Sequence, residues 1–288
     1  MENGECGLVF YNGLCCCLRQ ADHFPAMKKA CFTLAALMLL RGFTGIAFAQ
    51  LTPGSGTGLS VDASTVALFQ FEDAASTALD SAGNSRHATV SGTTAGTGLF
   101  GSGRVFNGTS GRLEFGNVFN ALSGSSGWTI EYFAKSNDGA NVPYLTNANP
   151  SAGWYFYPAD GSVGYGVKTS AAGNSWNVLT SASAPALDTF WHYYALTWAS
   201  GGLSVYRDGI LLGSSGSFGS WGGSNSYGVY MNYDSYWNTY NGAGLVDDLR
   251  FSSVARSALE IQTAYNLAAI PEPSTCALFV GLEHILFR

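Results

Sequence analysis

The segment WHYYALTWASGGLSVYRDGI, residues 191–210, decides the fold class. Large side chains occupy both alternating sets of positions from Trp191 to Trp198, which predicts a central strand covered on both faces. Leu203 and Val205 then form a second strand that enters a tight hairpin, because an Asp-Gly pair at 208–209 favours such a turn. This part of the chain is therefore predicted to lie in a buried antiparallel sheet.

The same pattern of short strand-like runs and glycine-bearing turns extends over most of the chain. The runs predicted as strands are residues 66–71, 104–106, 112–115, 129–134, 154–157, 162–168, 191–198, 203–207, 210–213, 228–233 and 244–251. No internal repeat with a period of about 20–50 residues is evident, which excludes solenoids and propellers. These observations favour a single sandwich of two sheets.

The composition excludes several classes of protein. The 288 residues include 37 glycines, with 14% aromatic and 11% charged residues, which suits short strands and tight turns. The formal net charge is −6 and the basic residues are scattered, so we expect no nucleic acid partner. All six cysteines lie outside residues 50–270, so the domain is predicted to have no disulfide and no redox site.

One helix is predicted at the end of the domain. Ser257 can cap it and Glu260 completes a capping box, while Leu259, Ile261 and Tyr265 are predicted to dock on a sheet. At the other end, residues 50–64 are rich in Gly, Ser and Thr and are predicted to be a flexible leader that does not pack.

The N-terminal region contains the pattern of a secretory signal peptide over residues 27–49. Met27-Lys28-Lys29 is a basic start, residues 30–40 form an apolar run, and Ala47-Phe48-Ala49 is a small-x-small cleavage site. We predict cleavage before Gln50. Residues 1–26 are interpreted as an extension from a wrongly assigned start.

The C-terminal segment, residues 267–288, is predicted to be a sorting tail. Its Pro271-Glu272-Pro273 motif and the apolar run 276–282 resemble the PEP-CTERM signal that exosortases recognise. Signals of that family continue through a full membrane-spanning helix, whereas Glu283 and His284 interrupt this run after seven residues. The tail is therefore interpreted as truncated, which puts exosortase-type processing in doubt.

Four groups of segments, in order, carry a resemblance to a known family. They are FQFED 69–73 with DSAGN 80–84, GRVFNG 103–108 with WTIE 128–131, WHY 191–193 with YRDG 206–209, and VDDLRF 246–251 with LEIQTAYN 259–266. This series resembles the LamG-like domains of the concanavalin A-like lectin and glucanase superfamily. The resemblance implies an all-β jelly roll of two antiparallel sheets, with one short C-terminal helix, over residues 65–266.

The acidic residues do not predict an enzyme. Glycan cleavage needs two carboxylates that flank the bond, and the Glu-x-Asp-x-x-Glu pattern of family-16 glycosidases is absent. Asp247 and Asp248 are neighbours on a predicted strand, so their side chains are expected to point to opposite faces. The isolated acids are Glu114, Glu131 and Glu260. His192 has no accompanying nucleophile motif, and we interpret it as a packed strand residue.

A structural calcium site is predicted at the loop from Asp80 to Asn84, which supplies carboxylate, amide and backbone oxygens. By the resemblance, Glu72 and Asp247 would complete the ligand shell if the first and last strands lie side by side. The alternative is that Asp80 and Asn84 stabilise an Asx-type turn.

An aromatic segment over residues 218–240 is the candidate ligand-binding site, because sugar rings stack on aromatic side chains. The candidate residues are Trp221, Tyr236, Trp237 and Tyr240. The alternative is that the tyrosines of this segment, Tyr227, Tyr230 and Tyr233 among them, fill the sandwich core.

The sequence thus predicts a non-catalytic protein, secreted or at the cell surface of a bacterium, that binds an extracellular polysaccharide or a cell-surface glycan. Two alternatives stay open. One is a structural matrix scaffold without a small ligand, and the other is a glycan-cleaving enzyme.

Overall fold

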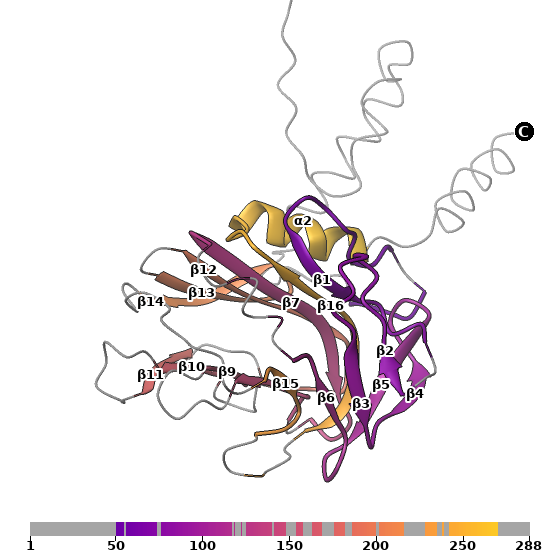
Figure 1. Ribbon diagram of the computed structural model, residues 1–288. Coiled ribbons are helices and arrows are strands. Elements are labelled where there is room, and N and C mark those ends of the chain that lie inside the picture. Colours follow the sequence, from indigo (N-terminus) through magenta and orange to yellow (C-terminus); the bar gives the residue numbers. More distant parts are fainter. Residues whose placement is uncertain are drawn as a thin grey trace, which may run out of the picture. The chain divides into compact units, whose positions relative to one another are not determined.

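The computed structural model in Figure 1 shows two sheets packed face to face, with the helix α2 (Ala258–Ala269) beside them. It describes residues 50–54, 56–73, 76–116, 118, 122, 125–139, 141–147, 154–157, 163–168, 176–181, 186–199, 202–215, 228–234, 238 and 242–269. Each sheet has eight strands within these residues, and all the pairings are antiparallel. The predicted two-sheet antiparallel sandwich is confirmed.

The first sheet has the strand order β14-β13-β12-β7-β16-β5-β4, and β1 also pairs with β16. Its strands are β1 (Thr65–Phe69), β4 (Thr94–Thr97), β5 (Ser102–Asn107), β7 (Gly127–Ser136), β12 (His192–Ala199), β13 (Gly202–Arg207), β14 (Ile210–Ser215) and β16 (Ala243–Ser252). The first and last strands of the domain therefore lie side by side, as the calcium prediction requires.

The second sheet has the order β11-β10-β9-β8-β15-β6-β3-β2. Its strands are β2 (Thr77–Ala78), β3 (Ala88–Ser91), β6 (Arg112–Glu114), β8 (Leu145–Asn147), β9 (Trp154–Tyr157), β10 (Val163–Lys168), β11 (Trp176–Ser181) and β15 (Tyr230–Met231). The short strand β15 joins β6 to β8, which lie far from it in the sequence.

The strand predicted to be central is central and covered on both faces. β12 pairs with β13 on one side and with β7 on the other. Tyr194 and Leu196 pack between the two sheets, whereas Tyr193 and Ala195 pack on the opposite face of the first sheet. Period-two alternation explains this division, because successive side chains of a strand point to opposite faces.

The core between the sheets is aromatic. Phe69 lies 4.9 Å from Phe115 between ring centroids, and Trp128 stacks on Trp198 at 6.3 Å. Trp128 and Trp198 are also directly paired across β7 and β12. Burial of such rings contributes most of the free energy that holds the sheets together.

A second apolar cluster covers the outer face of the first sheet. The helix α2 (Ala258–Ala269) packs there through Ile261, Tyr265 and Ala268, on the side of the first sheet that faces away from the second (Figure 1). The predicted capping box is confirmed, since Glu260 accepts a hydrogen bond from the Ser257 amide at 2.7 Å and donates its own amide to the Ser257 hydroxyl at 3.3 Å. The prediction that Leu259 docks on the sheet is wrong, because this side chain is 72% exposed.

The leader also differs from the prediction. Leu51 and Leu59 are buried in this second cluster, and Leu51 forms an isolated β-bridge with Trp191. Two leucines in a polar tract are enough to anchor it, because the outer face of the first sheet is apolar there and must be covered. The expectation that the leader does not pack is therefore wrong.

No helix in the part of the chain that the structure describes is both long enough and apolar enough to span a membrane.

Candidate functional site

The outer face of the second sheet presents a row of polar and aromatic side chains. Leu113, Leu145, Phe156 and Met231 point into the core between the sheets. Their neighbours along the same strands therefore point outward, since side chains alternate. These neighbours are Glu114 on β6, Tyr230 on β15, Thr146 on β8 and Tyr155 on β9.

The strand register places these outward residues side by side. Tyr230 is paired with Glu114 on one side and with Thr146 on the other. Thr146 is in turn paired with Tyr155. Directly paired residues of antiparallel strands share one face, so Glu114, Tyr230, Thr146 and Tyr155 form one row that crosses the strands.

Further contacts widen this row at β6 and β15. The Tyr230 hydroxyl donates a hydrogen bond to Glu114 at 3.3 Å, and its ring meets the ring of Tyr233 at a centroid distance of 5.3 Å. The Arg112 guanidinium lies 4.6 Å above the Tyr233 ring. We call the set of Arg112, Glu114, Thr146, Tyr155, Tyr230 and Tyr233 the tyrosine face. All of its side chains except that of Thr146 are partly exposed.

The phenols of Tyr155 and Tyr230 on the tyrosine face are neutral at physiological pH. Burial raises the pKa of Tyr155. Partial burial raises the pKa of Tyr230, and the neighbouring Glu114 carboxylate, which accepts its hydrogen bond, raises it further. A face of tyrosine rings with one carboxyl and one guanidinium group can stack on the apolar faces of sugar rings and hydrogen-bond their hydroxyls.

The four predicted ligand residues, Trp221, Tyr236, Trp237 and Tyr240, lie outside the described residues. Within the same aromatic segment, Tyr230 points outward while Val229 and Met231 fill the core. Tyr230 is therefore not one of the core residues, whereas Tyr227, the first of the alternate tyrosines, lies outside the described residues.

Three acidic side chains gather where the leader and residues 98–102 meet β16. Asp247 accepts a hydrogen bond from the Phe100 amide at 2.8 Å, and Asp248 accepts one from the Leu59 amide at 2.6 Å. Glu72 accepts the Ser102 amide at 3.2 Å. Together with Leu59, Asp248 and Glu72 line a pocket of about 420 Å³.

The expectation that Asp247 and Asp248 point to opposite faces is wrong. The register of β16 against β7 shifts between Asp247 and Arg250, which is a β-bulge, and Asp248 has a φ of 41°. A bulge breaks the simple alternation of a strand. Both carboxylates consequently face the leader and residues 98–100, on the same side of the sheet.

The ionised forms of the two buried carboxyls, Asp247 and Asp248, are disfavoured in this acidic cluster. Burial and repulsion by Asp248 raise the pKa of Asp247, and burial together with the charge of Glu72 raises the pKa of Asp248. Glycines surround the carboxylates, since a Cβ at Gly58 would lie 2.0 Å from Asp248 and one at Gly101 would lie 2.4 Å from Glu72. Backbone therefore approaches these carboxylates more closely than any other residue type would allow.

The predicted calcium ligands divide into two groups. Asp80 accepts the amides of Leu68, Ala82 and Arg86, and the Asn84 side chain donates to the carbonyls of Thr65 and Val66. These two residues hold their loop to β1, as the Asx-type alternative expects. Glu72 and Asp247 are chemically suited to a calcium ligand shell, since carboxylates are ligands that Ca²⁺ prefers. As they stand, no three Asp, Glu, His or Cys side chains in the described ranges form a metal-binding group.

Two other candidates for catalysis have structural partners. Glu131 is fully buried, where it accepts hydrogen bonds from Arg250 and, at 2.7 Å, from the Tyr193 hydroxyl. His192 is mostly buried, with its ring nitrogens 2.6 Å from Asp208 and 2.9 Å from Asp188. Glu131 therefore neutralises buried arginine, and His192 belongs to a charged network at the start of β12.

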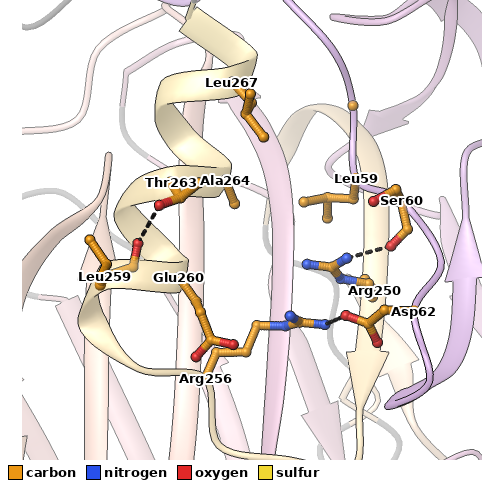
Figure 2. A pocket seen from close by; sticks show the side chains of 11 residues that line it. Leu59, Ser60, Asp62, Arg250, Arg256, Leu259, Glu260, Thr263, Ala264 and Leu267 are labelled. Atoms are coloured by element: carbon orange, nitrogen blue, oxygen red, sulfur yellow. Dashed lines mark hydrogen bonds and ion pairs between the residues drawn. The ribbon is translucent and has the colours of Figure 1, made fainter.

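A second pocket, of about 360 Å³, lies between the leader and α2 (Figure 2). Arg250 donates to the Ser60 carbonyl, and Arg256 pairs with Asp62 at 2.6 Å. Both guanidinium groups also approach Glu131. Because these charges are paired within the protein, we interpret the pocket as structural. We call the Asp62–Arg256 ion pair, which joins the leader to the residues just before α2, the clasp.

Fold and surfaces together define a jelly-roll sandwich with an aromatic outer face on its second sheet. The family model of the concanavalin A-like lectin/glucanases superfamily (Laminin_G_3) matches residues 107–262, and the chain belongs to this superfamily. The LamG-like resemblance is thereby confirmed. The comparison with curated proteins finds no match.

Solved structures share the fold at low sequence identity. Domain 4 of AbnA, a GH43 extracellular arabinanase from Geobacillus stearothermophilus, in complex with arabinotriose, has a TM-score of 0.57 and 18% identity over 71% of this chain and 100% of that domain. The receptor-binding domain of botulinum neurotoxin C/D mosaic serotype has a TM-score of 0.58 and 14% identity, and the alignment covers 73% of this chain and 55% of that one. The binding domain of Paraclostridial Mosquitocidal Protein 1 gives 0.57 and 14%, over 70% and 52%. At such identities the likeness shows the fold alone.

Proposed function

We propose that this protein is an exported, non-catalytic surface or matrix protein of a bacterium that binds carbohydrate through its sandwich. The observation that carries the proposal is the tyrosine face, where partly exposed rings lie beside hydrogen-bonding groups on a rigid sheet. Two fold relatives support it, since one was solved with arabinotriose and another, botulinum neurotoxin type C, depends on two ganglioside molecules for cell entry.

The signal-like residues 27–49 and the PEP-CTERM-like tail support an extracellular location. N-terminal sequencing of the exported form should give Gln50 as the first residue. A mature protein that retained Cys6 would contradict this part of the proposal.

Carbohydrate binding is tested with a panel of immobilised polysaccharides and glycans. The purified protein should bind at least one of them saturably, and Tyr230→Ala should weaken that binding by about tenfold, equivalent to about 1.4 kcal/mol. A structural scaffold without a ligand would show no saturable binding. Release of reducing ends from any polysaccharide would favour the glycan-cleaving alternative instead.

A bound calcium ion is the second part of the proposal, with Glu72 and Asp247 as ligands and Asp248 beside them. Its support is the gathering of these three acidic side chains, because a bound cation would stabilise the ionised carboxylates that burial disfavours. Calcium at about millimolar concentration should raise the melting temperature of the chelator-treated protein, since extracellular sites bind in that range. The shift should be much smaller in Glu72→Gln, and Asp80→Asn is the matched control. No shift in the parent protein would remove the ion.

A further inference from the structure

We infer that the tyrosine face binds an internal segment of an extended, neutral polysaccharide that lies across the strands of the second sheet. This inference rests on the proposed function and names its class of ligand.

The outward side chains of the second sheet form a straight row across five strands. Thr89, Glu114, Tyr230, Thr146 and Tyr155 come from five consecutive strands, β3, β6, β15, β8 and β9, and each is paired directly with the next. Neighbouring strands lie about 4.8 Å apart, so the row runs perpendicular to them. The Cα atoms of Tyr230 and Tyr155 are therefore roughly 9.5 Å apart. The row thus presents two rings separated by one strand.

The spacing of Tyr230 and Tyr155 matches the repeat of sugar residues along a chain. One sugar ring is roughly as wide as one strand spacing. Tyr230 and Tyr155 would therefore contact two sugar residues that are separated by one, on either side of the buried Thr146. A monosaccharide would reach one ring at a time, so binding to both requires a chain.

The side chains of the row come from interior strands of the sheet. Glu114, Tyr230 and Tyr155 belong to strands in the interior of the sheet. Within the described residues the row continues in both directions, to Thr89 on β3 and to Gly166 on β10, whereas recognition of a chain end needs a wall that closes one side. The arrangement therefore favours internal segments over chain ends.

The charges on the tyrosine face are balanced. Glu114 is engaged by the Tyr230 hydroxyl and Arg112 lies over the Tyr233 ring, so the tyrosine face has one charge of each sign. The whole chain carries a formal net charge of −6, which disfavours polyanions. A neutral polysaccharide fits this balance.

The test is calorimetric titration of the purified protein with cello-, xylo- and arabino-oligosaccharides, from disaccharide to hexasaccharide, and with the parent polysaccharides. Each series is repeated with chains whose reducing end has been converted to the alditol. The variants are Tyr155→Ala and Tyr230→Ala, each with its Phe counterpart, which keeps the ring. Phe190→Ala, which removes a half-exposed ring before β12 of the first sheet, is the control. Melting curves establish that each variant is folded.

In at least one series the affinity should rise by about tenfold or more from disaccharide to pentasaccharide, irrespective of the chain end. Each Ala variant should lose about tenfold, while both Phe variants and Phe190→Ala bind as the parent protein does. Binding that needs an intact end, or that both Ala variants retain, overturns this inference and leaves carbohydrate binding in place. Absence of binding to every sugar and polysaccharide overturns the proposed function and this inference together.

Discussion

At the scale of single residues, the sandwich contains buried polar groups whose partners differ sharply. The Tyr193 hydroxyl donates to the buried Glu131 carboxylate, which also neutralises Arg250. The Tyr194 hydroxyl, one position along β12, is equally buried and has no hydrogen-bond partner within the described residues. Adjacent tyrosines of one strand therefore contribute to stability in opposite ways.

This contrast gives a prediction with its own control. Tyr193→Phe should lower the free energy of unfolding by about 1.5–3 kcal/mol, because it removes a hydrogen bond to a charged group. Tyr194→Phe should leave stability unchanged or raise it, because it deletes a hydroxyl that is buried unpaired. Urea unfolding of the two variants measures both effects. Equal destabilisation by both variants would contradict these assignments.

Residue types alone also mispredicted the Asp247-Asp248 pair. Strand alternation places neighbours on opposite faces, and this reasoning fails where a bulge interrupts the ladder. Nothing in the local sequence marks the bulge, because Asp248 is not a glycine and yet adopts a positive φ. The register of β16 against β7, and not the local sequence, determines that the two carboxylates lie on the same side of the sheet.

At the scale of elements, strands and the helix followed from local patterns. The strands predicted at 154–157 and 203–207 match β9 and β13 to within one residue, and the capping box set the start of α2. Short strands such as β2 and β8 escaped prediction, because two or three residues are too few to show a periodicity. Their pairing partners, rather than their own sequence, determine that they are strands.

The leader shows the same limit and gives a second prediction. Leu59 is buried under the helix although its neighbours are polar, whereas Leu259 on the helix is exposed. Leu59→Ala should cost about 2–4 kcal/mol in the free energy of unfolding, the range for buried leucines. Leu259→Ala should cost less than about 0.5 kcal/mol. A leader that does not pack would make the two costs alike.

A third prediction concerns the clasp between Asp62 and Arg256. Burial alone would raise the pKa of Asp62, but hydrogen bonds from Ser64 and Arg256 and the charge of Arg256 outweigh it, so this pKa lies well below its ordinary value of 3.8. A carboxyl whose pKa is lowered by folding stabilises the fold above its unfolded pKa and loses that contribution as the pH falls.

Asp62→Asn should therefore lower the melting temperature at pH 7, and its difference from the parent protein should shrink below about pH 4. Melting curves across that range measure the difference. A difference that is independent of pH would show that the carboxylate charge of Asp62 contributes nothing.

At the scale of the whole molecule, the sequence sufficed to predict the fold. Ordered segments such as FQFED 69–73 and VDDLRF 246–251 resemble the LamG-like family, and the family match and the two sheets confirm that fold. The tyrosine face could not be predicted in the same way. It requires β15 to lie between β6 and β8, a pairing of segments more than eighty residues apart that no local pattern encodes.

The central claim is that this jelly roll binds carbohydrate through rings on the outer face of its second sheet. The most direct measurement is the dissociation constant of the purified protein for a neutral polysaccharide, compared with that of a double Tyr155→Ala and Tyr230→Ala variant that melts at the same temperature. We predict saturable binding by the parent protein that the folded double variant loses by about a hundredfold. Equal affinity of the two proteins, or no affinity in either, would contradict the claim.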